Sequence, residues 1–226
     1  FSMASGGLID VQGGTLKNDY ANANWSGNQS SLNVAAGANV DLRNNNIVID
    51  ALTGAGNVFD AGYTNSLTIG VAGGSGNFTG SLGVGGTTVS VVKNGAGTQS
   101  FSGPTSYTLG TTVNQGTLTF NQLTTGTVNA NVAGLGGGQL ATSSLNVASG
   151  ALIDLNPNVN FSSANGGTTL SGAGTIRLSS GIWWMGNGGG GTVISMASGG
   201  LIDIQGGTIK NDYANANWTA NQASLN

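Results

Sequence analysis

The stretch Ser2–Asn33 reads SMASGGLIDVQGGTLKNDYANANWSGNQSSLN, and Ser195–Asn226 reads SMASGGLIDIQGGTIKNDYANANWTANQASLN, so one segment recurs after 193 residues. Of the 32 paired positions, five differ, and apolar positions stay apolar. The differences are Val11 to Ile204, Leu16 to Ile209, Ser26 to Thr219, Gly27 to Ala220 and Ser30 to Ala223. A copy this close indicates a tandem repeat, which is the first signal to weigh in assigning a fold.

We therefore expect residues 1–226 to form one continuous array, with residues 1–193 as one full period and residues 194–226 as the start of the next. In such an array each structural repeat contacts only its neighbours along the axis. Because the five differences preserve polarity, the two copies are expected to occupy equivalent positions on one axis. The second copy then fits a further rung above it, from a next period or from a neighbouring chain.

The composition differs from that of an ordinary soluble domain. Charged residues make up 6% of the chain, glycine accounts for 42 of 226 residues, and His and Cys are absent, as is Glu. Hydrophobic residues reach 38% and fall in short alternating runs, which are typical of strands with one buried face. No window keeps apolar residues at helical spacing without interruption by Gly, Asn or Thr. The sequence predicts an all-β chain with almost no helix.

The charge pattern narrows the classes of partner. The net charge is −3 and the chain has five basic residues, too few to neutralise a phosphate backbone, so nucleic-acid binding is not expected. No apolar run approaches the roughly 18 residues of a membrane span, so no membrane contact is expected in this segment. A chain that is β-rich, poor in charge and free of Cys suits the outside of a bacterial cell. We expect an extracellular or cell-surface protein.

A unit smaller than the full period recurs along the chain. Residues 1–11, 32–42, 145–155 and 194–204 align without gaps, each with an apolar pair at period two, a glycine-containing turn and a second apolar pair. Alternation places one Asp of each copy on the outer face of a strand. These residues are Asp10, Asp41, Asp154 and Asp203.

Glycines two residues apart mark the corners between short strands. The pieces Leu52–Asn57 and Leu170–Thr175 both read apolar-x-Gly-Ala-Gly-polar, and this spacing allows positive φ and close approach of backbones. Between corners we expect strands of three to six residues. They include Ile47–Asp50, Ser66–Gly70, Thr87–Val92, Gly116–Phe120 and Thr175–Leu178.

Short strands without helical crossovers fit either a parallel solenoid or an antiparallel sandwich. The repeats favour the solenoid, because identical pieces find identical environments in stacked rungs. Rungs of about 20 to 25 residues, stacked about 4.8 Å apart, give about eight to ten rungs in each period. The predicted fold is a right-handed parallel β-helix, or β-solenoid, with Gly/Asn-rich corners.

The stretch KNGAGTQSFSG at residues 93–103, followed by TSYTLGTTVNQGTL at residues 105–118, resembles the autotransporter-associated β-strand repeat, also called the passenger-associated transport repeat. It departs from that pattern at Gln99, where the family usually has Leu, and at Leu109, where it usually has Gly. The resemblance implies a passenger of bacterial type V secretion that forms a right-handed parallel β-helix, commonly a stalk or adhesin. It names no ligand.

The sequence contains few residues that could form a catalytic or metal-binding site. Without His, Cys and Glu, the common zinc, thiolate and Ser-His-Asp sites cannot be built here. The glycine runs at 73–76 and 186–191 lack the Asp that a calcium-binding nonapeptide requires, so no metal or other cofactor is expected. One enzymatic alternative remains, a polysaccharide-degrading β-helix that uses the outward Asp residues. The alternative role of these Asp residues is to keep the fibre soluble.

Aromatic residues beside Asn and Asp give the candidate binding surface, because Tyr and Trp stack on sugar rings. The segment Asn18–Trp25 and its copy Asn211–Trp218 carry this pattern, and Trp183 and Trp184 form a second site. The alternative is that these rings pack on the adjacent rung. The candidate residues are Tyr20, Trp25, Trp183, Trp184, Tyr213 and Trp218.

These observations predict an extracellular, fibrous repeat protein without catalytic activity, a stalk, filament or matrix component and adhesin. Its expected partners are further copies, end to end or in one long tandem array, together with surface glycans. Two alternatives stay open: a glycan-binding adhesin that uses the Tyr, Trp and Asn loops, and the polysaccharide-degrading enzyme.

Overall fold

A computed structural model describes residues 1–19, 23–83, 88–105, 107, 109–121, 144–156, 159–160, 169–185, 192–211 and 216–226. In these residues all regular secondary structure is β-strand, and every strand pairing is parallel. The described residues contain no helix that is long and apolar enough to cross a membrane.

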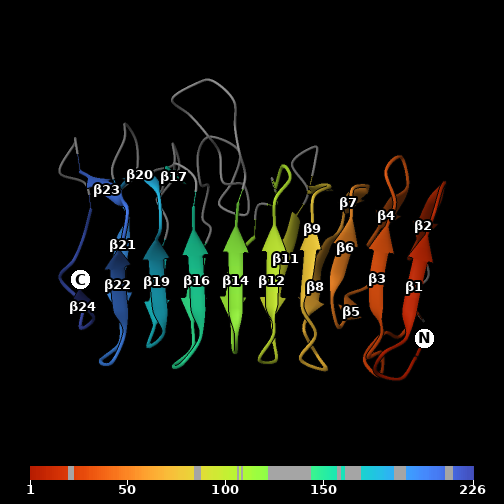
Figure 1. Cartoon of the computed structure of the whole chain (residues 1–226), viewed down its shortest axis with the longest axis horizontal. Helices are drawn as coiled ribbons and strands as arrows, with labels where there is room; N and C mark the ends of the chain where they lie inside the picture. The colour runs from red at the N-terminus through yellow and green to blue at the C-terminus, as the bar shows by residue number, and fades with distance from the viewer. Residues whose placement is uncertain are drawn as a thin grey trace.

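The largest sheet has ten strands and runs the length of the molecule (Figure 1). In spatial order it contains β1 (Leu8–Val11), β3 (Ser31–Val34), β6 (Leu52–Gly54), β9 (Gly76–Phe78), β12 (Thr98–Phe101), β14 (Thr117–Phe120), β16 (Leu152–Leu155), β19 (Thr175–Leu178), β22 (Leu201–Ile204) and β24 (Ser224–Leu225).

A second sheet of seven strands covers another face. It contains β21 (Val193–Met196), β18 (Thr169–Gly172), β15 (Ser144–Val147), β13 (Thr111–Val113), β11 (Thr88–Lys93), β8 (Thr64–Ile69) and β5 (Ile47–Ile49). Two shorter sheets are built from strands that each come directly after a strand of the ten-stranded sheet along the chain. One contains β10 (Ser81–Leu82), β7 (Asn57–Phe59), β4 (Asn39–Asp41) and β2 (Thr15–Lys17), and the other contains β17 (Val159–Asn160), β20 (Gly181–Trp184) and β23 (Gly207–Lys210).

The chain visits these sheets in turn, which makes the molecule a parallel β-solenoid, as the sequence predicts (Figure 1). The turns differ in length. In the ten-stranded sheet one turn leads from Leu32 to its partner Leu52, and a longer turn leads from Thr175 to its partner Leu201. Eight such steps lead from β1 to β22, in agreement with the rung number expected for one period.

The core lies between the sheets and is built from alternate residues of each strand. In the ten-stranded sheet one inward position is aliphatic in most rungs and is filled by Leu32, Leu52, Leu118, Ile153, Ile176 and Ile202, all buried. The next position faces outward and is polar in every rung. It holds Asp10, Asn33, Thr53, Asn77, Ser100, Thr119, Asp154, Arg177 and Asp203.

The corners need glycine where the sequence predicts it. Gly54 and Gly172 lie at the same place in the two Gly-Ala-Gly pieces and have φ values of 100° and 98°. A Cβ at Gly54 would lie 2.1 Å from the carbonyl oxygen of Val34, and one at Gly172 would lie 2.1 Å from that of Val147. A side chain at either corner would therefore overlap the backbone of the rung below.

One corner is closed by a buried lysine. Lys93 has no exposed surface, and its Nζ donates hydrogen bonds to the carbonyl oxygens of Asn94 at 2.6 Å and Gly95 at 2.8 Å. Burial lowers the pKa of Lys93, and the nearby carboxylate of Asp50 opposes that shift. The ammonium group thus joins two carbonyl groups of the turn and satisfies them within the protein.

The two copies of the repeated segment occupy equivalent positions. In the first copy Leu8 pairs with Ser31, and in the second Leu201 pairs with Ser224, in each case between neighbouring strands of the ten-stranded sheet. The second pair is the first pair shifted by one full period. The strand register is therefore the same in both copies at these residues.

Hydrogen bonds repeat in the same way. The backbone N–H of Gln29 donates to Met3 at 2.9 Å, and that of Gln222 donates to Met196 at 2.8 Å. The side-chain amide of an Asn then reaches back to the Asp of the preceding rung in both copies. These bonds join Asn33 to Asp10 at 2.7 Å and Asn226 to Asp203 at 3.1 Å.

The prediction that Asp41 lies on the outer face of a strand, like its counterparts in the other copies, is wrong. Residues 1–11, 145–155 and 194–204 pass from the level of the seven-stranded sheet to the ten-stranded sheet, whereas residues 32–42 pass from the ten-stranded sheet to the four-stranded sheet. Asp41 therefore stands on another face and is 2% exposed. Asp203 is also buried, at 3%, because Arg177, Gln205 and Asn226 surround its carboxylate.

Candidate functional site

A groove of about 580 Å³ lies between the loop at residues 23–26 and the solvent-facing side of β5 and β8. It combines loop residues with residues from two successive turns of the solenoid. The groove is lined by Ala23, Asn24, Trp25, Ser26, Asn45, Asn46, Val48, Ser66 and Thr68.

The floor of the groove is the outer face of the seven-stranded sheet. Val48 and Thr68 are directly paired between β5 and β8, and both are half-buried. At the next outward position the N–H of Ser66 donates to Oδ1 of Asn46 at 2.8 Å. Strand alternation thus places two methyl-bearing side chains at the centre and amide and hydroxyl groups beside them.

The wall of the groove is the Trp25 loop. The ring of Trp25 is stacked on Phe1 with 4.6 Å between ring centroids, and its indole N–H donates to Oδ1 of Asn18 at 3.2 Å. Within the loop, Oδ1 of Asn24 accepts the N–H of Ser26 at 2.8 Å. These contacts hold the backbone of the wall in one conformation.

Further hydrogen bonds tie the wall to the floor. Nδ2 of Asn18 donates to the carbonyl oxygen of Asn45 at 3.2 Å, and Nδ2 of Asn45 donates to that of Asn18 at 3.3 Å. Nδ2 of Asn28 donates to the carbonyl oxygen of Val48 at 2.8 Å. The groove is therefore preformed, because both sides are held by buried or half-buried amide groups.

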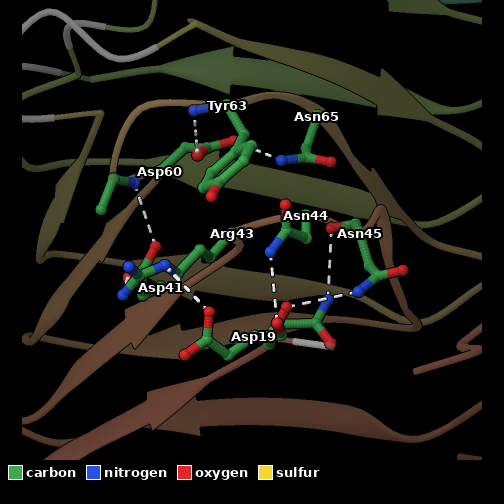
Figure 2. A network of polar contacts seen from close by, with 10 residues as sticks. Asp19, Asp41, Arg43, Asn44, Asn45, Asp60, Tyr63 and Asn65 are labelled. Atoms are coloured by element: carbon green, nitrogen blue, oxygen red, sulfur yellow. Dashed lines mark hydrogen bonds and ion pairs between the residues drawn. The ribbon is translucent and has the colours of Figure 1, made fainter. Parts of the chain in front are cut away.

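A polar corner, which shares Asn45 with the lining of the groove, is drawn in Figure 2. Its salt bridge joins Nε of Arg43 to Asp19 at 3.0 Å, and Asn44 donates to the carbonyl oxygen of Asp19 at 3.2 Å. Arg43 and Asn44 have φ values of 20° and 68°, so the chain turns sharply here. Asn45 belongs both to this corner and to the lining of the groove.

The carboxylates of the polar corner are used by the fold. Asp41 accepts the N–H of Ala61 at 3.0 Å, and Asp60 accepts the N–H of Tyr63 at 3.0 Å and the amide of Asn65 at 2.5 Å. Asp41 and Asp60 are each 2% exposed. In the described residues no group of three or more acidic side chains is placed to hold a metal ion. The corner therefore serves to satisfy buried N–H groups.

The structure corrects part of the aromatic binding surface. Trp25 is 5% exposed and Trp183 is fully buried, and both belong to the hydrophobic core. Neither presents a ring face on which a sugar could stack. The alternative interpretation, in which the ring packs on the solenoid, describes Trp25 correctly.

The structure describes only some of the other predicted aromatic residues. Trp218, the copy of Trp25, is half-buried and packs against the core. Trp184 lies in β20, and its side chain is outside the described part of the structure. Tyr20 and Tyr213 also lie outside the described residues.

Two of the predicted outward Asp residues lie beside a cation in the ten-stranded sheet. Arg177 lies between Asp154 and Asp203 in the outward column of the ten-stranded sheet. Its Nε donates to Asp203 at 2.9 Å, and this bond lowers the pKa of the Asp203 carboxyl group. Asp154 accepts the hydroxyl of Ser179 at 2.6 Å. Both carboxylates thus have partners within the protein.

Sequence reasoning does not find the groove residues Asn46, Val48, Ser66 and Thr68. The strands that carry Val48, Ser66 and Thr68 are predicted, and alternation marks their outward positions. Nothing in the sequence says that the loop at residues 23–26 faces the same groove as these strands, since that depends on where each rung turns.

Comparison with known proteins gives no relative. No family model matches the chain, and no curated protein or solved structure matches it significantly.

Proposed function

We propose that this chain is a segment of an extracellular stalk or filament, a structural repeat protein of the bacterial surface without catalytic activity. The observation that carries the proposal is the equivalent placement of the two copies, which share strand register and inter-rung hydrogen bonds. Equal environments at a fixed period are what a protein needs in order to grow by adding identical units.

The ends of the solenoid support this proposal. Leu8 is 54% exposed at one end and Leu225 is 64% exposed at the other. β1 and β24 are the outermost strands of the ten-stranded sheet, so each has one side without a partner among the described residues. An uncovered edge and apolar surface favour pairing with another rung. The partner is a further copy, either the next period of one chain or a neighbouring chain.

The resemblance of residues 93–118 to the passenger-associated repeat supports the secretion route and the location outside the cell. In the structure these residues make up slightly more than one turn, from the end of β11 to β14. A fibre that reaches from the cell surface suits such a passenger.

The enzymatic alternative receives less support from the Asp residues proposed for it. Asp41 is buried on a separate face, and Asp154 and Asp203 are hydrogen-bonded to Ser179 and Arg177. A general acid or base must be within reach of its substrate. The glycan-binding alternative has to rest on residues other than Trp25 and Trp183.

Length measurement tests the stalk directly. Chains with one, two and three full periods are compared by small-angle scattering and electron microscopy. Eight rungs about 4.8 Å apart predict that each added period lengthens a rod of constant width by about 38 Å. A compact multi-period particle, or a length that does not rise linearly with period number, would contradict the proposal.

A further inference from the structure

We propose that the groove at residues 23–26, 45–48 and 66–68 binds a short neutral oligosaccharide, an activity beyond the structural role proposed above. Its volume of about 580 Å³ lies in the range of small-molecule sites, about 300 to 1,000 Å³. The shape alone does not select a ligand, whereas the chemistry of the lining does.

The lining selects a ligand without charge. None of the nine lining residues is charged. The neighbouring cation, Arg43, is paired with Asp19 at 3.0 Å and with Asp41 at 4.0 Å in the polar corner. A phosphate or carboxylate ligand would lose part of its hydration in this groove without gaining a cation as a partner. Burial of such an unpaired charge is unfavourable.

The lining offers the hydrogen-bonding groups that sugar hydroxyls need. The amide Nδ2 groups of Asn24 and Asn46 and the hydroxyls of Ser26, Ser66 and Thr68 have no hydrogen-bond partner in the described parts of the chain. Amide groups donate and hydroxyls both donate and accept, so the set suits a diol or an amide substituent.

The floor offers an apolar contact of matching size. The side chains of Val48 and Thr68 stand side by side on neighbouring strands, about 4.8 Å apart. A pyranose ring has C–H groups on its faces and hydroxyls on its rim. One face can pack on these methyl groups while the rim reaches the amides and hydroxyls of the groove.

An extended peptide fits this groove less well, because the adjacent strand edge is occupied. β5 is the last strand of the seven-stranded sheet, but its hydrogen-bonding edge is covered by the segment that contains Asn28 and Ser30. Asn28 donates to the carbonyl oxygen of Val48 at 2.8 Å, and Ser30 accepts the N–H of Asp50 at 2.8 Å. Addition of a peptide strand needs free backbone groups at the edge.

The wall of the groove recurs with the period. In the second copy Asn217 accepts both the N–H of Thr219 at 3.0 Å and its hydroxyl at 2.6 Å, as Asn24 accepts the N–H of Ser26 in the first. An array would therefore present one groove in each period, and several weak sites on one fibre bind a glycan surface with avidity.

The first test uses the isotope-labelled chain and NMR titration. The probes are the tetrasaccharides of chitin, cellulose, xylan and mannan, with tetragalacturonate as an acidic comparator. At least one neutral probe should bind with a Kd of about 1 mM or tighter and shift the amide signals of residues 24–26, 46–48 and 66–68. Absence of binding by all neutral probes, shifts confined to other residues, or equally tight binding of tetragalacturonate would overturn the proposal.

Variants then locate the site. Val48→Arg fills the floor, and Val92→Arg is its control, because Val92 stands in the same outward column, next to Thr68 but outside the groove. Affinity for the binding probe should fall at least tenfold in Val48→Arg and stay within twofold in Val92→Arg. Equal affinities in the two variants would refute the site.

A milder pair covers the case in which Val48→Arg does not fold. Thr68→Val removes one hydroxyl from the groove without changing the volume much, and Thr112→Val removes one from the same column outside it. Several-fold weaker binding is expected for Thr68→Val alone. The rod-length measurement does not depend on these residues, so loss of the saccharide site leaves the stalk proposal standing.

Discussion

The side chain of Gln99 is hydrogen-bonded to the backbone of Leu52, two turns below it. Oε1 of Gln99 accepts the N–H of Leu52 at 3.0 Å, and its Nε2 donates to the carbonyl oxygen of Leu52 at 3.0 Å. Gly76 lies between them, and a Cβ there would be 2.7 Å from Oε1 of Gln99. The amide of Gln99 thus takes the place of a peptide group in the strand ladder, through the space that Gly76 leaves.

Replacement of Gln99 by Leu should destabilise the protein, although the passenger-associated repeat that this stretch resembles usually has Leu there. The variant leaves the N–H and the carbonyl oxygen of Leu52 buried without their partners, at a cost of about 1 to 3 kcal/mol. The free energy of unfolding in urea measures this loss. Gln29→Leu, on an exposed residue, is the control and should change it by less than about 0.5 kcal/mol. Equal stability of Gln99→Leu and wild type would show that water replaces the amide.

Gly172→Ala should be among the most destabilising single changes in the chain. Its φ of 98° disfavours a side chain, and the new Cβ would lie 2.1 Å from the carbonyl oxygen of Val147. The expected loss is about 3 kcal/mol or more, because both strain and overlap contribute. Gly13→Ala is the matched control, since a Cβ at Gly13 meets nothing within 4 Å. A thermal unfolding midpoint that is the same in both variants would contradict the corner geometry.

The ion pair between Arg177 and Asp203 should make stability depend on pH. Because the folded-state pKa of Asp203 is lowered below 3.8, its contribution is present above that value and is lost as the pH falls through the folded-state pKa. At pH 6 we expect Arg177→Met to be less stable than wild type by about 1 kcal/mol. The difference should shrink below pH 3.8. Urea unfolding at pH 6 and at lower pH tests this, with Lys17→Met as a control for loss of an exposed cation. A pH-independent difference would mean that Arg177 acts through packing alone.

The uncovered ends should make the chain associate. Leu8→Lys places a charge on the exposed end of β1 and should shift the chain toward monomer in sedimentation velocity. Tyr63→Lys is the control, because Tyr63 is 42% exposed but lies on the connection between β7 and β8, away from the ends. A wild type that stays monomeric at high concentration, or equal behaviour of the two variants, would argue against end-to-end contact.

Most of the architecture can be predicted from the amino-acid sequence alone. Two-residue alternation marks the strands, paired glycines mark the corners at Gly54 and Gly172, and the repeated segment requires equivalent rungs. These features depend on local geometry and on the identity of the copies, which are evident without knowledge of distant contacts.

Which residues meet depends on the folded chain. Turns differ in length, as the steps from Leu32 to Leu52 and from Thr175 to Leu201 show, so one sequence pattern falls on different faces of the solenoid. For this reason Asp41 lies outside the column expected for it. The ring of Trp25 stacks on Phe1 and belongs to the core, and its loop lines the groove together with residues of the two following turns. Sequence spacing does not fix these contacts, because they depend on where each rung bends.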